Sequence, residues 1–279
     1  MRVFVTGATG QIGRALRKAL INQSGIEPFF GQRTLDRTST GDAVGVDVSD
    51  RESFRNALRA TRPDVVVHLA GVTPSRHDIS TSEAHAVNVR SVAVLAEAMS
   101  DFGIGRTILS SSAAVYGDAG RGPFAESAPL APSSSYARDK VAAEFLLRDR
   151  DLNASGETVA LRIFNGFGGA SSSSLVTRLA ESTEGDPVPI WGLDSFVRDY
   201  IHIDDVVQAL LCSLSAELPA RDTVFNIGTG IPTSNRLLIE TLLKRGPVHA
   251  RVTDGPSSYS CADTSLARAH LGFSAERRI

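Results

Sequence analysis

A tyrosine and a lysine four residues apart follow a cluster of three serines near the middle of the chain. The serines, at the end of an apolar run, are Ser110, Ser111 and Ser112, and the pair is Tyr136 and Lys140. In a helix that begins at the tyrosine, both side chains lie on the same face, because residues four apart are neighbours there. A nearby ammonium favours the phenolate and lowers the pKa of the phenol. The pattern predicts a general acid/base near neutral pH, with a serine hydroxyl sharing the substrate oxygen.

The start of the chain predicts the element that would place a cofactor beside this pair. A short apolar strand at 2–5 runs into the turn 6–13, and apolar residues then recur at helical spacing. In this strand–turn–helix context, Gly7 permits the tight turn, Gly10 lets the backbone approach a pyrophosphate, and Gly13 allows close packing of helix on strand. The helix N-terminus faces the phosphates with free N–H groups. We predict a dinucleotide site here.

The end of the second expected strand, at 27–33, bears on which dinucleotide binds. An acidic residue there binds the ribose 2′-hydroxyl of NAD, whereas an arginine accommodates the 2′-phosphate of NADP. The chain reads Gly31, Gln32 and Arg33, with no acid. Arg33 therefore favours NADP(H) over NAD(H).

Strands and helices alternate as far as residue 165, which predicts an α/β fold of the Rossmann type with a doubly wound parallel sheet. Further strands are expected at 44–49, 63–71, 106–110 and 159–165, and helices at 50–61, 81–101 and 136–150. Ligands bind at the carboxyl ends of such strands, where the serine cluster lies. We expect a dinucleotide-binding domain at 1–165, to which 195–229 returns, and a smaller C-terminal substrate domain at 166–194 and 230–279. His68, inside an apolar run, is expected to be a satisfied core histidine.

Composition excludes several classes of partner. The 279 residues carry a formal net charge of -2 with acids and bases interspersed, which argues against nucleic acid or an anionic membrane. Two cysteines suit a reducing compartment and predict neither a disulfide scaffold nor a metal site. The chain opens directly on a strand, and no apolar run approaches the roughly 18 residues of a membrane helix. We expect a cytoplasmic protein without a metal.

Seven segments, taken in order, resemble a known family. They are 6–13, 68–71, 110–117, the Tyr136 to Lys140 pair, 161–165, 198–205 and 225–230. Together they are similar to the extended short-chain dehydrogenase/reductases of the NAD-dependent epimerase/dehydratase family, which acts on nucleotide sugars. The resemblance implies a large Rossmann domain, a small C-terminal domain that holds the nucleotide sugar, and a homodimer.

The resemblance also implies roles for individual residues. Ser112, Tyr136 and Lys140 would be catalytic, with the Ser112 hydroxyl forming a hydrogen bond with the reacting sugar oxygen. The residues expected to bind the cofactor, with Arg33 added on the argument above, are Gly7, Gly10, Gln11, Ile12, Gly13, Arg33, Asp47, Val48, Leu69, Ala70, Gly71, Ser110, Tyr136 and Lys140. Those expected to bind the substrate are Ser111, Ser112, Asn165 and Arg198, the last at a phosphate.

Departures from the family's patterns narrow the chemistry. Dehydratases of the family carry an Asp-Glu pair after the catalytic hydroxyl, but this chain has Ala113 and Ala114, so elimination of water lacks its acid and base. No cysteine lies near the site in sequence, which argues against epimerisation next to the carbonyl. Two hydride transfers at C4 of a nucleotide-activated hexose remain. One is a 4-ketoreductase or dehydrogenase with an exchangeable cofactor, which Arg33 favours; the alternative is a 4-epimerase with tightly bound NAD. A catalytically idle nucleotide-binding protein is a third reading.

Overall fold

The computed structural model describes residues 1–35, 41–73, 78–118, 120, 122–150, 156–169 and 173–279. Its centre is a seven-stranded parallel sheet in the order β11-β6-β5-β4-β1-β2-β3. The strands are β1 (Arg2–Thr6), β2 (Glu27–Gln32), β3 (Ala43–Gly45), β4 (Val65–His68), β5 (Arg106–Ser112), β6 (Glu157–Ile163) and β11 (Asp222–Ile227). The order winds outward in both directions from the β1–β4 boundary, which confirms the predicted doubly wound Rossmann-type sheet.

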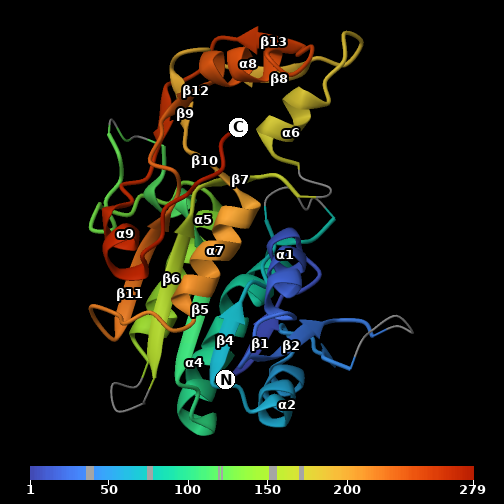
Figure 1. Cartoon of the computed structure of the whole chain (residues 1–279), viewed down its shortest axis with the longest axis vertical. Coiled ribbons are helices and arrows are strands. Elements are labelled where there is room, and N and C mark those ends of the chain that lie inside the picture. The colour runs from blue at the N-terminus through green and yellow to red at the C-terminus, as the bar shows by residue number, and fades with distance from the viewer. Residues whose placement is uncertain (36–40, 74–77, 119, 121, 151–155, 170–172) are drawn as a thin grey trace.

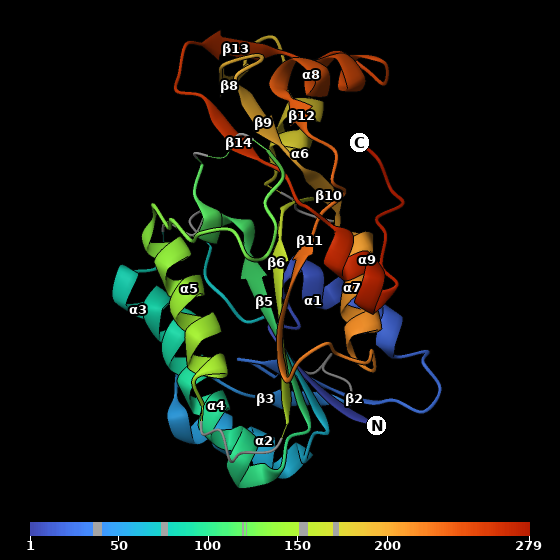
Figure 2. The same ribbon diagram turned by 90° about the vertical axis from the view of Figure 1, so that its left-hand side faces the viewer.

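Helices cover both faces of this sheet, as Figure 2 shows edge-on. One layer holds α1 (Gln11–Leu20), α7 (Ile203–Ser213) and α9 (Ser265–Leu271); the other holds α2 (Arg51–Thr61), α4 (Ser91–Phe102) and α5 (Ser135–Arg148). The apolar run of β1 serves both, because successive strand side chains point to opposite faces. Val3 and Val5 enter the core under α1 and α7, while Phe4 enters the core under α2 and α4. No helix in the described ranges is long and apolar enough to cross a membrane.

Two elements near the serine and tyrosine motifs differ from the sequence prediction. The helix expected at 81–101 is interrupted: α3 (Thr81–His85) leads into a π-helical turn (Ala86–Arg90) before α4. The buried Asn88 amide, on that turn, bonds both the N–H and the C=O of Val72, so it ties the loop after β4 to this helix. Strand β5 extends to Ser112 instead of ending at Ser110.

A smaller part lies beyond the carboxyl ends of the strands (Figure 1). Its elements are β7 (Asn165–Phe167), α6 (Leu175–Ala180), β8 (Val188–Trp191), β9 (Phe196–Arg198), β10 (Tyr200–His202), β12 (Thr233–Ser234), α8 (Asn235–Leu243), β13 (Ala250–Thr253) and β14 (Ser258–Ser260). It has a separate apolar core, in which Leu179 and Leu238 are fully buried.

The contacts of β9 and α9 bear on the domain boundaries. Strand β9 pairs with β12 and β14 of the smaller part, although 195–229 was expected to belong to the larger domain. Helix α9 buries Ala267 and Leu271 in the core under α1 and α7, although 230–279 was expected to belong to the smaller one. We therefore propose that β9 belongs to the smaller part and α9 to the larger one, with the last residue, Ile279, packing against the core of the smaller part again.

Candidate active site

Two glycines of the turn after β1 have no room for a side chain. Gly7 adopts a φ of +68°, and a Cβ on it would lie 2.6 Å from the Ala70 nitrogen. A Cβ on Gly13 would lie only 2.2 Å from the Gly7 oxygen. Gly10, in extended conformation, precedes the first residue of α1. These contacts confirm the tight turn and the close helix–strand packing that the spacing predicts.

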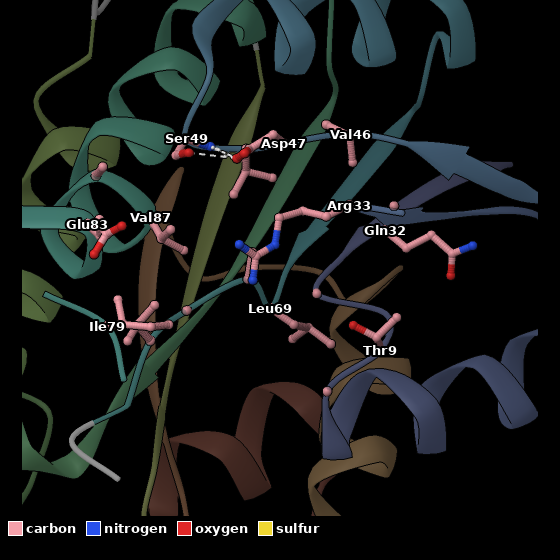
Figure 3. Close-up of a pocket in the computed structure, with 18 of the residues that line it drawn as sticks. Thr9, Gln32, Arg33, Val46, Asp47, Ser49, Leu69, Ile79, Glu83 and Val87 are labelled. Atoms are coloured by element: carbon pink, nitrogen blue, oxygen red, sulfur yellow. Dashed lines mark hydrogen bonds between the residues drawn. The ribbon is translucent and has the colours of Figure 1, made fainter. Parts of the chain in front are cut away.

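A cavity of about 730 Å³ lies beside this turn (Figure 3). Eight of the residues expected to bind a cofactor line it: Gly7, Gly10, Arg33, Asp47, Val48, Leu69, Ala70 and Gly71. Gln11, Ile12 and Gly13 do not line it but form the first turn of α1, where Ile12 packs against the core. The backbones of Gly7 and Gly10 line the cavity next to the N-terminus of α1, which fits a dinucleotide pyrophosphate, because a glycine has no side chain that would keep the phosphates away from the backbone.

The side chain of Arg33 extends into the middle of this cavity, between Asp47 and Leu69 (Figure 3). The Asp47 carboxylate accepts hydrogen bonds from the Ser49 nitrogen at 2.9 Å and the Ser49 hydroxyl at 2.6 Å. These bonds, with the charge of Arg33, hold the pKa of Asp47 below its usual value. A Cβ on Gly31 would lie 2.8 Å from a Val46 methyl carbon, so a side chain at that point of β2 requires its neighbours to shift.

The predicted catalytic residues Ser112, Tyr136 and Lys140 lie together at the end of β5. The hydroxyl of Tyr136 shares a hydrogen bond with that of Ser112. Lys140 is buried, lies 5.7 Å from the centre of the Tyr136 ring, and donates from Nζ to the Ser110 carbonyl at 2.7 Å. A Cβ on Gly71, which lines the cofactor cavity, would lie 3.4 Å from the same Nζ. The group therefore adjoins that cavity.

The electrostatics of the pair differ from the sequence prediction. Burial raises the pKa of Tyr136, and the Ser112 hydrogen bond opposes that rise only in part. Lys140, whose Nζ donates to the Ser110 carbonyl, does not offset this rise in the free protein, contrary to the lowering that the sequence predicted. Burial lowers the pKa of Lys140 to about 8, against the attraction of Glu144 and Asp139. In the free protein Tyr136 is therefore a neutral phenol that can donate a proton.

Ser111, expected at the substrate, points to the opposite face of β5, because side chains alternate along a strand. It is buried and donates to the Glu144 carboxylate. Glu144 also accepts two hydrogen bonds from Arg162 Nε and one from Arg162 Nη2, the shortest 2.7 Å. The structure thus separates Ser111 from Ser112 and makes it part of a buried ion-pair network. Glu144 lies one turn after Lys140 on α5, so helical spacing marks its attraction to Lys140, whereas no signal in the sequence marks its contacts with Ser111 and Arg162.

His68 is the satisfied core histidine that was expected. Its Nδ1 lies 3.0 Å from the Thr6 hydroxyl and its Nε2 lies 3.1 Å from the Ser91 hydroxyl. Burial, with the charge of Lys140, lowers the pKa of His68 to about 3. The ring stays neutral at physiological pH and adds no charge beside Lys140.

A second cavity, of about 500 Å³, lies in the smaller part. Asn165 and Arg198, both expected to bind substrate, line it together with Trp191 and Phe196. Asn165 follows β6, whose Ile163 is paired with Ser112 in the sheet. The cavity therefore begins two residues beyond the strand position that faces the catalytic serine.

Asp199, which sequence reasoning missed, holds the segments around this cavity together. It is fully buried and accepts hydrogen bonds from the Thr229 nitrogen and hydroxyl, the Gly230 nitrogen and the Ala262 nitrogen. Only its position next to Arg198 marks it in the sequence, because its partners lie more than 29 residues away along the chain.

Comparison with known proteins agrees with this geometry. The sequence profile described as the NAD dependent epimerase/dehydratase family matches residues 3–228. The chain belongs to this family. Among similar proteins are UDP-glucose 4-epimerases from Bacillus subtilis, 27% identical with 100% of this chain and 94% of that protein covered, and from Streptomyces lividans, 28% identical with 86% and 80% covered.

One similar protein of known structure was solved as a complex with a nucleotide sugar and NAD. MoeE5 in complex with UDP-glucuronic acid and NAD is 30% identical, covers 100% of this chain and 95% of its own, and superimposes with a TM-score of 0.86. The family assignment confirms the resemblance that the seven sequence segments indicated.

Proposed function

We propose that this protein is a nucleotide-sugar 4-epimerase that uses NAD. The observation that carries the proposal is the Ser112, Tyr136 and Lys140 group, which adjoins the cavity that fits a dinucleotide. Asn165 of the second cavity, where we place the nucleotide sugar, follows by two residues the strand position paired with Ser112. The relatives named UDP-glucose 4-epimerases support the epimerase over the reductase that the sequence alone favoured.

The chain's own residues perform the binding and the proton movement. In the first cavity, the backbones of Gly7, Gly10 and Gly71 would hold the dinucleotide, which when bound supplies a hydride acceptor and donor. Tyr136, a neutral phenol in the free protein, first releases its own proton to solvent; as a phenolate, which the nearby ammonium of Lys140 favours, it then takes the proton of the sugar C4 hydroxyl and later returns it. The Ser112 hydroxyl forms a hydrogen bond with the same sugar oxygen.

Two further residue types fit the reaction. Asn165 and Arg198 in the second cavity supply an amide and a guanidinium to the nucleotide diphosphate. Ala113 and Ala114, in the turn after Ser112, carry no ionisable group, which supports hydride transfer without loss of water. Homodimer formation and a cytoplasmic location belong to the same proposal, on the family resemblance and the two free thiols.

A 4-ketoreductase with exchangeable NADPH is the second candidate. Arg33 favours it, because its guanidinium lies in the cofactor cavity and no acid ends β2. Absorbance of the cofactor released on denaturation separates the two. Stoichiometric NAD supports the epimerase, whereas empty protein that requires added NADPH supports the reductase.

The catalytic assignment is tested by Tyr136→Phe. We expect turnover of UDP-glucose, or of a panel of nucleotide 4-keto sugars, to fall by at least about a hundredfold, which is the usual contribution of a general acid/base. Tyr259→Phe, a tyrosine of β14 that lines neither cavity, is the matched control and should keep full activity. Full activity in Tyr136→Phe would contradict the assignment.

A further inference from the structure

Two arginines line the second cavity, Arg198 from β9 and Arg178 from α6, and none of the other described residues that line it is Asp or Glu. An excess of positive charge on the wall of a cavity raises the local concentration of an anionic ligand. Arg178 thus adds a second positive charge to the cavity beside that of Arg198.

The donors of Arg198 are already engaged in the protein. Nη2 donates to Asp118 at 3.0 Å and to the Ser258 hydroxyl at 2.7 Å, and Nη1 donates to the Val197 carbonyl at 2.9 Å. Its guanidinium also lies 3.8 Å from the centre of the Phe196 ring. Arg198 is therefore a fixed cation, partly neutralised by Asp118, with few N–H groups left for a phosphate.

Arg178 is the opposite case. In the described part of the chain, no carboxylate, carbonyl or ring contacts its guanidinium, and the side chain is exposed. Its helix is nevertheless fixed, because Val176 and Leu179 on either side of it are buried in the core of the smaller part. Arg178 thus presents an unengaged fork of donors to the cavity from an anchored backbone.

We propose that Arg178 binds the diphosphate of the nucleotide sugar as a second cation beside Arg198. The inference rests on the proposed function, and it adds a residue that sets affinity for the phosphates. A guanidinium binds phosphate through two parallel hydrogen bonds, which explains why an arginine without protein partners is useful there. Its effect appears in substrate binding and not in the chemical step, because the diphosphate is unchanged in the reaction.

The test measures how affinity depends on the number of phosphates. UDP, UMP and uridine are titrated calorimetrically into the full-length protein and into Arg178→Gln, Arg178→Lys and Arg251→Gln. Arg251, an exposed arginine of β13 outside the cavity lining, controls for loss of one positive charge from the same part. We expect UDP to bind Arg178→Gln about tenfold more weakly, as for loss of one charge-assisted hydrogen bond, with uridine unchanged. Arg178→Lys should recover part of the loss, and Arg251→Gln should show none.

The outcomes separate this inference from the proposed function. If wild type binds UDP and Arg178→Gln binds it equally well, or if uridine loses as much affinity as UDP, only the role of Arg178 is overturned. If wild type binds none of UDP, GDP, dTDP and ADP, the proposed function and the inference both fail. In turnover assays Arg178→Gln should raise KM with little change in kcat; a fall in kcat alone would contradict a binding role.

Discussion

The buried ammonium of Lys140 should give the protein a distinctive dependence of stability on pH. Burial lowers the pKa of Lys140 from 10.5 to about 8. Because the folded value lies below the unfolded one, the unfolded chain binds more protons between these two pH values, and stability rises with pH across that window. At about 1.4 kcal/mol per pH unit, the charged form costs about 3 kcal/mol of stability at neutral pH.

Comparison with Lys140→Met isolates this contribution. Methionine keeps most of the apolar stem but has no charge, so other titrating groups cancel in the difference between the two proteins. Most of the cost at neutral pH, about 2–3 kcal/mol, should disappear between pH 7 and pH 10. The variant should therefore lose its relative advantage over wild type by that amount as the pH rises.

Denaturant unfolding of cofactor-free protein at pH 7, 8, 9 and 10 measures the difference, with the free energies extrapolated linearly to water. Lys140→Met should also lose turnover at every pH, since Lys140 is assigned to the catalytic group. Two parallel stability profiles, with a constant difference from pH 7 to pH 10, would refute the reasoning. They would mean that water reaches Lys140 and that its proton is not displaced by burial.

Two further substitutions test the cofactor turn and the buried network. Gly13→Ala should destabilise the protein by about 1–3 kcal/mol and abolish dinucleotide binding, because the new Cβ would lie 2.2 Å from the Gly7 oxygen. Gly41→Ala is the control, since nothing lies within 4 Å of its Cβ. Equal melting temperatures of Gly13→Ala and wild type would contradict the packing role of Gly13. Glu144→Gln should cost about 3–5 kcal/mol in urea unfolding, because it leaves Arg162 buried without its counter-charge, whereas the double change Glu144→Leu with Arg162→Met should recover most of it. A double variant no more stable than the single one would contradict that account.

The fold and the cofactor turn were predictable because they depend on local rules. Glycine spacing and helical periodicity after β1 describe one continuous segment, and an apolar run such as 65–67 in β4 is typical of a strand buried on both faces. The Ser112, Tyr136 and Lys140 group was predictable for a related reason. Helical spacing joins two of its members, and the sheet brings a strand end beside them.

The sequence could not show how deeply Tyr136 is buried or towards which side of the sheet Ser111 points. The raised pKa of Tyr136 depends on how much water burial removes, whereas spacing tells only which charges are near. Ser111 was expected at the substrate only as the neighbour of Ser112, and the sequence placed the end of the strand at Ser110. With β5 continuing to Ser112, alternation turns Ser111 towards Glu144. The double winding was foreseen, but the contacts of β9 and α9 join segments remote in sequence, and no local pattern marks them.

The register between β5 and β6 links the two cavities and so restricts the chemistry. Ser112 is paired with Ile163, and Asn165 opens the substrate cavity two residues further on. Two residues span at most about 7 Å and neighbouring strands lie about 5 Å apart, so the Asn165 Cα lies within about 12 Å of the Ser112 Cα. Under the proposed function, a span of this order holds one sugar between the diphosphate and Tyr136. The proposed site therefore selects the reacting hydroxyl by its distance from the phosphate, and it favours the far side of the ring, where C4 lies, over the positions next to the diphosphate.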